Sequence, residues 1–153
     1  MPHPGSHAPD FTLPDADMGL VKLSRYKGKN VVLYFYPKDD TPGCTMEAIE
    51  FSDMEEEFAG YDTVILGISR DDCISHADFR DKHGLAVQLL ADVDGKVCEK
   101  YGVWREKEKD GVRKMGIVRS TFIIDKQGML RHAFYGVTAK GHAAEILNLI
   151  KEL

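Results

Sequence analysis

The sequence predicts an α/β fold with a mixed central sheet flanked by helices. Two continuous apolar runs, Val31–Tyr36 and Thr63–Ser69, lack the polar alternation of half-exposed strands, which is typical of parallel strands buried on both faces. A segment with helical spacing follows each run. A later antiparallel hairpin and a final amphipathic helix complete the order, and a thioredoxin-like sheet fits this order of elements.

Local sequence patterns support each predicted element in the first half of the chain. Phe11–Leu13 and Leu20–Leu23 flank a polar turn and predict an N-terminal β-hairpin. The helix after the first buried strand begins around Thr41–Cys44, where apolar residues recur near helical spacing among glutamates. The helix after the second strand is capped by Asp71 or Asp72 and ends at Gly84.

The second half of the chain continues the same alternation. The charged run Arg105–Asp110 is predicted to be a solvated loop. Because no internal repeat or linker is visible, residues 1–153 are expected to form a single domain. The remaining predicted elements are a short strand at Val87–Leu90, a short helix at Gly95–Tyr101, a hairpin made of Thr121–Asp125 and Leu130–Tyr135, and a helix from about His142.

Composition limits the classes of function. The chain of 153 residues is 43% hydrophobic and 29% charged, with a formal net charge of -5. This mild acidity differs from the concentrated basic face of nucleic-acid binders. No apolar run approaches the roughly 18 to 20 residues of a membrane-spanning helix, and the N-terminus lacks the basic start and apolar core of a signal peptide. We therefore expect a cytoplasmic protein without nucleic-acid or membrane partners.

The cysteines indicate where chemistry is located. Cys44, Cys73 and Cys98 are too scattered for a disulfide scaffold, and none belongs to a Cys-x-x-Cys pair. A metal site needs ligands clustered at short spacing, so none is expected. Cys44 follows the strand Val31–Tyr36 and a Thr41-Pro42-Gly43 turn. Working sites in open α/β sheets lie beyond the carboxyl ends of parallel strands, which favours a reactive cysteine over a core residue.

The surroundings of Cys44 suit a nucleophile. A cysteine reacts as the thiolate, and a helix N-terminus favours negative charge. Arg119 precedes the predicted strand and is the candidate cation, because it would reach the same end of the sheet. Each neighbouring residue has a plainer reading when it is taken alone. Thr41 then caps a helix, Pro37 forms a turn, Arg119 is a surface cation, and Glu47 is ordinary first-turn acidity.

A family resemblance joins these residues. Pro37-x-x-x-Thr41-x-x-Cys44 resembles the Pro-x-x-x-Thr/Ser-x-x-Cys signature of the peroxiredoxins. The longer run from Tyr34 to Thr45 is similar to the bacterioferritin comigratory protein, or Q-type, branch. The similarity extends over nearly the whole chain, at Ala8–Phe11, Gly67–Ser69, Leu89–Asp92, Tyr101–Trp104 and Arg119–Asp125.

The resemblance implies a thiol-dependent peroxidase that reduces hydrogen peroxide and organic hydroperoxides without a metal, haem or flavin cofactor. It implies that the Cys44 thiolate is peroxidatic and becomes a sulfenic acid. Thr41 would orient the peroxide, Pro37 would pack over the sulfur, Arg119 would stabilise the leaving oxygen, and Glu47 would hold the arginine. Thioredoxin, glutaredoxin or a small thiol would be the reductant. We expect a monomer or a weak homodimer.

The chain departs from the family pattern at the resolving cysteine. Many Q-type members carry it five residues after the peroxidatic cysteine, where this chain has Ile49. Others place it in the following helix, at about Arg80. Three fates of the sulfenic acid therefore stay open. Cys73 resolves it from the start of that helix, Cys98 resolves it, or an external thiol attacks it directly.

Two other functional classes compete with the peroxidase. A thioredoxin-type thiol-disulfide oxidoreductase would need a cysteine where Thr41 stands and a proline at the start of the late strand, where the chain has Arg119-Ser120-Thr121. A non-catalytic, chaperone-like module would keep the fold without peroxide consumption. The residues expected to have only packing or surface roles are Trp104, His76, His83 and His132.

Overall fold

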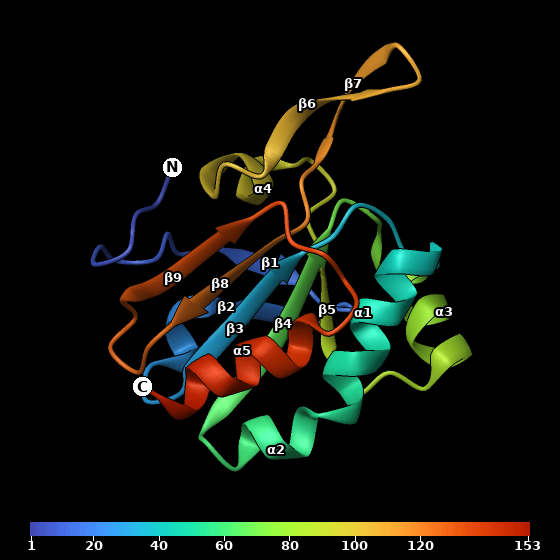
Figure 1. Ribbon diagram of the computed structural model, residues 1–153. Helices are drawn as coiled ribbons and strands as arrows, with labels where there is room; N and C mark the ends of the chain where they lie inside the picture. The colour runs from blue at the N-terminus through green and yellow to red at the C-terminus, as the bar shows by residue number, and fades with distance from the viewer.

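A five-stranded mixed sheet forms the centre of the computed structural model, which describes residues 1–153 (Figure 1). The strands lie in the order β5-β4-β3-β8-β9. The three strands β3, β4 and β5 are parallel, whereas β8 runs antiparallel to β3 and β9 runs antiparallel to β8. The bounds are β3 (Asn30–Phe35), β4 (Thr63–Ser69), β5 (Gln88–Ala91), β8 (Ser120–Ile124) and β9 (Leu130–Tyr135). The two continuous apolar runs are neighbouring strands, which confirms the predicted mixed sheet.

Four helices cover one face of the sheet. They are α1 (Pro42–Asp53), α2 (Glu55–Ala59), α3 (Cys73–His83) and α5 (His142–Lys151), which pack on Val32, Tyr34 and Tyr36 of the β3 segment (Figure 1). The helix predicted after Cys44 is divided at Met54 into α1 and α2. None of the helices combines the length and the apolar character needed to span a membrane.

The opposite face is covered by smaller elements. The predicted N-terminal hairpin is present as β1 (Thr12–Pro14) and β2 (Leu20–Lys22), followed by the 3-10 helix η1 (Leu23–Tyr26). With α4 (Lys96–Lys100), they pack on Val31, Leu33 and Phe35, the residues of β3 that alternate with those facing the helices. Strand side chains point alternately to the two faces, so β3 contributes residues to both cores. Its sequence is therefore continuously apolar.

The charged segment Arg105–Asp110 is not the predicted loop. Trp104–Lys109 forms β6, which pairs antiparallel with β7 (Val112–Ile117) in a hairpin that projects from the body (Figure 1). Asp110 and Gly111 make the turn with φ values of 54° and 76°, as a two-residue hairpin turn requires. The prediction failed because most of this hairpin is solvated on both sides, so its strands lack apolar alternation.

The contact between Tyr34 and Gly67 generates a stability prediction. These residues are register partners on β3 and β4, and a methyl group at Gly67 would lie 2.7 Å from the Tyr34 Cζ. Tyr34 is fully buried and stacks on Phe51 at 4.8 Å, so its ring has no room to move. Gly67→Ala is therefore expected to lower the free energy of unfolding by about 1–3 kcal/mol in denaturant titrations.

Gly19→Ala provides the matched control for this substitution. A methyl group there would lie 3.5 Å from the nearest atom, an Asp15 side-chain oxygen, which is ordinary contact. An equal loss of stability in both variants would show that the Tyr34 contact is not the cause.

Candidate active site

Cys44 lies at the N-terminal end of α1, directly beyond the carboxyl end of β3. Thr41 is the N-cap residue and Pro42 occupies the first helical turn, where its missing N–H costs no intrahelical hydrogen bond. The side chain of Cys44 is only 2% exposed and packs in the core beneath α1. A sulfur in this position lies at the positive end of the helix dipole, which stabilises a thiolate.

Arg119 approaches Cys44 from another part of the chain. Its Nη2 lies 3.4 Å from the Cys44 Sγ. The register explains this contact, because Phe35 at the end of β3 pairs with Ser120 at the start of β8. The residue before β8 is thereby brought to the carboxyl end of β3. Gly43 has no side chain, which leaves room for the guanidinium beside the helix. A methyl group at this position would lie 3.1 Å from the Arg119 Nη2.

Glu47 holds the other side of the guanidinium. The Arg119 Nη1 donates to the Glu47 Oε1 at 2.6 Å, and the Glu47 side chain is 1% exposed. Burial raises the pKa of Glu47 from its ordinary value to about 7, and the Arg119 charge and hydrogen bond only partly oppose this. Cys44 and Glu47 are three residues apart on α1, so one helix face presents both groups to one arginine.

Thr41 and Pro37 take different positions in the loop before α1. The Thr41 Oγ1 donates to the carbonyl of Lys38 at 2.8 Å and does not cap the helix through its side chain. Pro37 is exposed directly after the β3 segment. Its packing over the sulfur therefore stays a prediction.

A buried polar network, which the sequence patterns did not reveal, anchors the same loop. Asp39 accepts hydrogen bonds from the Tyr36 hydroxyl at 2.6 Å and the Ser75 hydroxyl at 2.8 Å. The Nδ1 of His76 lies 2.7 Å from the same carboxylate, and its Nε2 lies 2.9 Å from the Leu90 carbonyl oxygen. The network joins the loop before α1 to the first turn of α3. His76 is therefore a core histidine.

The other two cysteines differ in their access to Cys44. Cys73 is the first residue of α3 and is half-buried. Because β3 and β4 are parallel neighbours, α1 and α3 start at the same end of the sheet. Cys98 is fully buried in the core on the opposite face of the sheet, and burial and Asp92 raise the pKa of its thiol. The sheet therefore separates Cys98 from Cys44.

Trp104, expected to have a packing role, has an aromatic-face contact. Trp104 packs under the Arg70 guanidinium, whose carbon lies 4.4 Å from the ring centroid. No group of three or more His, Cys, Asp or Glu side chains is arranged to hold a metal ion. The arrangement around Cys44 can stabilise a thiolate and an oxyanion next to it, which suits nucleophilic sulfur chemistry.

Comparison with known proteins gives a consistent family match. Residues 4–133 match the AhpC/TSA family. The chain is 48% identical to peroxiredoxin Bcp of Bacillus subtilis, over 97% of this chain and 95% of that protein. It is 40% identical to peroxiredoxin Bcp of Escherichia coli, again over 97% of this chain and 95% of the relative.

Solved structures give the same result. The fold is similar to that of a cysteine-to-serine mutant of PrxQ from Xylella fastidiosa, with a TM-score of 0.94, 35% identity, and coverage of 99% of this chain and 97% of that one. It is also similar to the bacterioferritin comigratory protein of Xanthomonas campestris, described for its alkyl peroxide reduction activity, with a TM-score of 0.91, 35% identity and 98% coverage of both chains.

The raised pKa of Glu47 predicts how stability varies with pH. The neutral carboxyl is favoured in the folded protein, whereas in the unfolded chain the Glu47 carboxyl ionises near its ordinary pKa of 4.5. The contribution of Glu47 to stability is therefore complete below about pH 4.5 and is lost as the pH rises to about 7. We expect the difference in unfolding free energy between wild type and Glu47→Gln to fall by about 3 kcal/mol over this range.

Denaturant titrations at a series of pH values measure this difference. Glu57→Gln serves as the control, because Glu57 is exposed on the neighbouring helix α2. If wild type and Glu47→Gln show parallel pH profiles, Glu47 does not carry the expected raised pKa.

Proposed function

Since the chain belongs to the AhpC/TSA family and is a Q-type peroxiredoxin, a thiol-dependent peroxidase, we propose that Cys44 is the cysteine that reacts with the peroxide. The observation that carries this assignment is the position of the sulfur, 3.4 Å from the Arg119 guanidinium at a helix N-terminus. A fixed cation and oriented N–H groups at this point stabilise both the thiolate and the oxygen that leaves. Neither Cys73 nor Cys98 has a comparable partner.

The proposed step is an in-line displacement on the terminal peroxide oxygen. The Cys44 thiolate attacks this oxygen, an S–O bond forms, and the O–O bond breaks. Sulfur is oxidised by two electrons to the sulfenic acid, and the terminal oxygen keeps its hydrogen. The alkoxide or hydroxide that leaves is stabilised by Arg119 and takes a proton from water. The Thr41 hydroxyl, whose hydrogen points to the Lys38 carbonyl, can accept the hydrogen bond of the peroxide.

We propose that an external thiol attacks the sulfenic acid of Cys44 directly. This attack forms a mixed disulfide and releases water, and a second thiol then restores Cys44. Resolution by Cys73 would need the starts of both α1 and α3 to unwind, although the Asp39 network ties these two segments together. An external thiol needs only the start of α1 to open. Thioredoxin, glutaredoxin and glutathione are the candidate reductants.

The location and the assembly follow from the proposed chemistry. Recycling by thiols suits a reducing compartment, and we place the protein in the cytoplasm. One chain supplies Cys44, Arg119 and Glu47, so the site is complete in a monomer. A weak homodimer is compatible with the same geometry.

The roles of Cys44 and Arg119 predict the outcome of a peroxide-consumption assay. Cys44→Ser is expected to abolish thiol-dependent consumption of hydrogen peroxide. Arg119→Met is expected to slow the reaction by about 100-fold or more, as when one preorganised oxyanion donor is removed. Arg131→Met, on the exposed side of β9, is the control and is expected to keep wild-type activity.

The assay also tests the two rival classes. Equal peroxide consumption by wild type and Cys44→Ser would overturn the peroxidase assignment to Cys44. Insulin reduction that depends on Cys44 would instead indicate a thiol-disulfide oxidoreductase. Absence of both activities would favour the non-catalytic, chaperone-like module.

The external-thiol route predicts that Cys73→Ser keeps full turnover with the reductant that gives the highest activity with the wild type. One equivalent of hydrogen peroxide is then expected to remove one thiol per chain, measured by thiol titration. Sensitivity to over-oxidation should be the same in wild type and variant, because the sulfenic acid persists equally in both. Loss of two thiols in the wild type, together with lost turnover in Cys73→Ser, would identify Cys73 as the resolving cysteine.

A further inference from the structure

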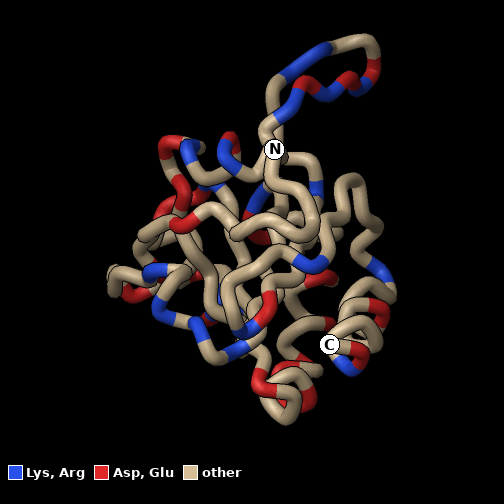
Figure 2. The backbone as a smooth tube through the Cα atoms, turned by 90° about the vertical axis from the view of Figure 1, so that its left-hand side faces the viewer, with Lys and Arg blue, Asp and Glu red and all other residues tan.

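The β6–β7 hairpin separates its charges onto two faces. Side chains alternate along each strand, and paired residues share a face. One face carries Arg105, Lys107 and Lys109 of β6 opposite Gly116, Lys114 and Val112 of β7, and therefore holds four cations and no acid. The opposite face carries Glu106, Glu108 and Arg113, which form two ion pairs at 3.9 Å. Figure 2 shows both signs of charge along this hairpin.

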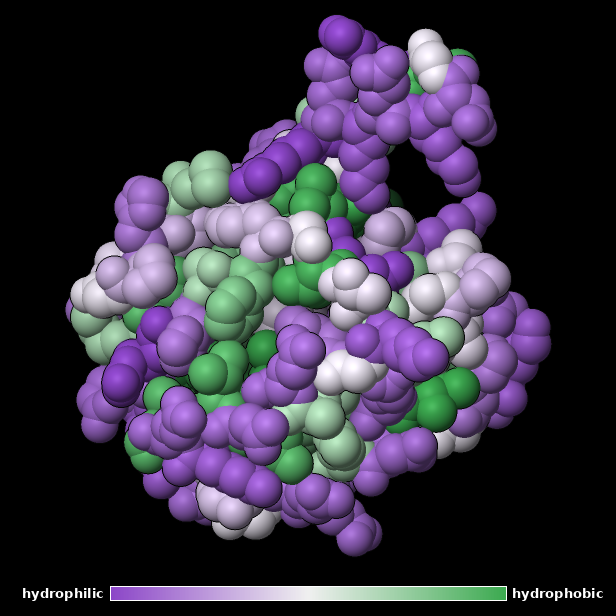
Figure 3. Space-filling model, in the orientation of Figure 1, coloured by the Kyte–Doolittle hydropathy of each residue, from purple (hydrophilic) through white to green (hydrophobic).

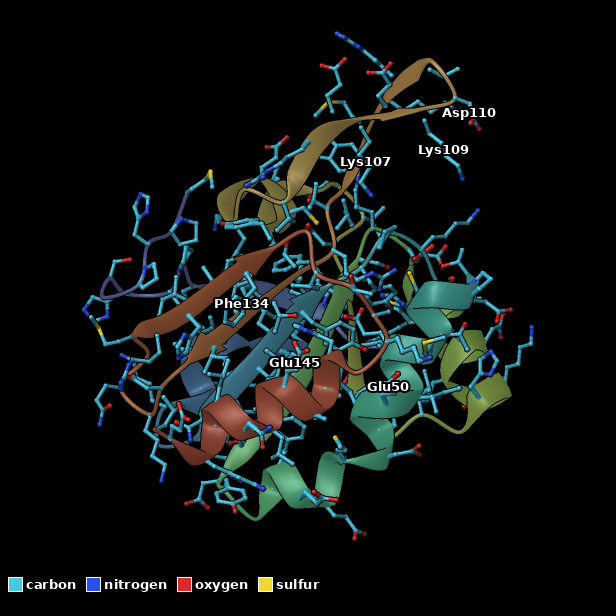
Figure 4. The ribbon with its side chains drawn as sticks, viewed as in Figure 1. Glu50, Lys107, Lys109, Asp110, Phe134 and Glu145 are labelled. Carbon is cyan, nitrogen blue, oxygen red and sulfur yellow. The ribbon has the colours of Figure 1, made fainter.

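The cationic face is turned toward the body of the molecule. The guanidinium carbon of Arg105 lies 4.4 Å from the centroid of the Tyr135 ring on β9. The side chain of Lys107 runs back over Gly116, where a methyl group would lie 3.3 Å from the Lys107 Cδ. This direction leads to the base of β7, two residues before Arg119. Figure 4 shows Lys107 and Lys109 extending from the hairpin toward the body.

Lys107 points toward the segment that carries Arg119, the partner of Cys44. Partial burial and the charge of Arg119 lower the pKa of Lys107, and the negative charge of Cys44 opposes this effect. Lys107 forms none of the ion pairs of the hairpin, because Arg113 is the cation in both of them. Lys107 and Lys114 are directly opposite each other, and like charges in this position destabilise a strand pair. An anion between them would remove this repulsion.

A concavity is present where such an anion would lie. It has a volume of about 380 Å³ and is lined by Lys107, Lys109, Lys114, Val112, Met115 and Asp110. Figure 3 shows an open gap between the hairpin and the body of the molecule. Three lysines supply charge there, and Val112, which shares their face, supplies apolar surface that is about half exposed. The lining therefore suits a small organic anion. The single acid, Asp110, is at the turn.

We propose that the cationic face of the β6–β7 hairpin binds the anionic end of an organic hydroperoxide whose O–O bond is reduced at Cys44. This inference rests on the proposed role of Cys44, and it names the substrate class as hydroperoxides that carry a carboxylate. The formal charge of the whole chain is -5, so an anion would otherwise be repelled on approach. The cationic face provides a local region of positive charge beside the site.

The test compares ω-hydroperoxyhexanoate with its neutral methyl ester. Single-turnover consumption of each hydroperoxide by the reduced protein, followed in quenched flow, gives a second-order rate constant for each substrate. Wild type is expected to prefer the acid, and salt should reduce this preference. Lys107→Gln and Lys114→Gln are each expected to lower the acid-to-ester ratio roughly fivefold, the size of one partly exposed charge contact. Lys107→Arg should retain the ratio.

Arg113→Gln is the matched control, because it removes the same charge from the opposite face of the hairpin. An equal fall of the ratio in Arg113→Gln would show a general charge effect and overturn the proposal. The proposal is also overturned if Lys107→Gln slows acid and ester equally, or if it slows only re-reduction by thioredoxin. Reduction of the ester through Cys44 without preference for the acid overturns this inference alone. Failure of Cys44 to reduce either substrate overturns the proposed function as well.

Discussion

The guanidinium of Arg119 joins two groups of one helix, the sulfur of Cys44 and the carboxyl group of Glu47, and the whole site depends on its position. The pairing of β8 with β3 sets this position, because Ser120 stands opposite Phe35. A slip of one residue in this register would turn every side chain of β8 to the other face of the sheet. The buried residues of β8 belong to two different cores, which makes such a slip costly.

Two kinds of polar burial occur near Cys44, and they have opposite consequences. The Asp39 network pairs its buried groups and links two loops through the interior, which gives rigidity to both. The Tyr34 hydroxyl and the Glu47 Oε2, in contrast, are buried without a hydrogen-bond partner. Unpaired buried groups reduce stability, and functional sites are where proteins retain them.

The fold and the centre of the site follow from local sequence features, whereas the surrounding contacts do not. The apolar run Val31–Tyr36 and the turn before Cys44 predict a strand and a helix start. The position of Arg119 before the late strand makes it the candidate cation, and the family resemblance adds the role of Glu47. The Asp39–His76 contact joins residues 37 apart in the chain, and no periodic pattern marks such a pair. The β6–β7 hairpin was missed because the apolar alternation that reveals strands comes from burial, and most of this hairpin has none. Its Asp110-Gly111 turn was the available signal.

The β6–β7 hairpin has its own hydrogen-bond ladder and shares no strand with the central sheet. Changes in the hairpin residues that line the concavity therefore leave the β3–β8 register undisturbed. Bond cleavage and substrate choice are under separate structural control, so mutation can vary one while selection holds the other constant.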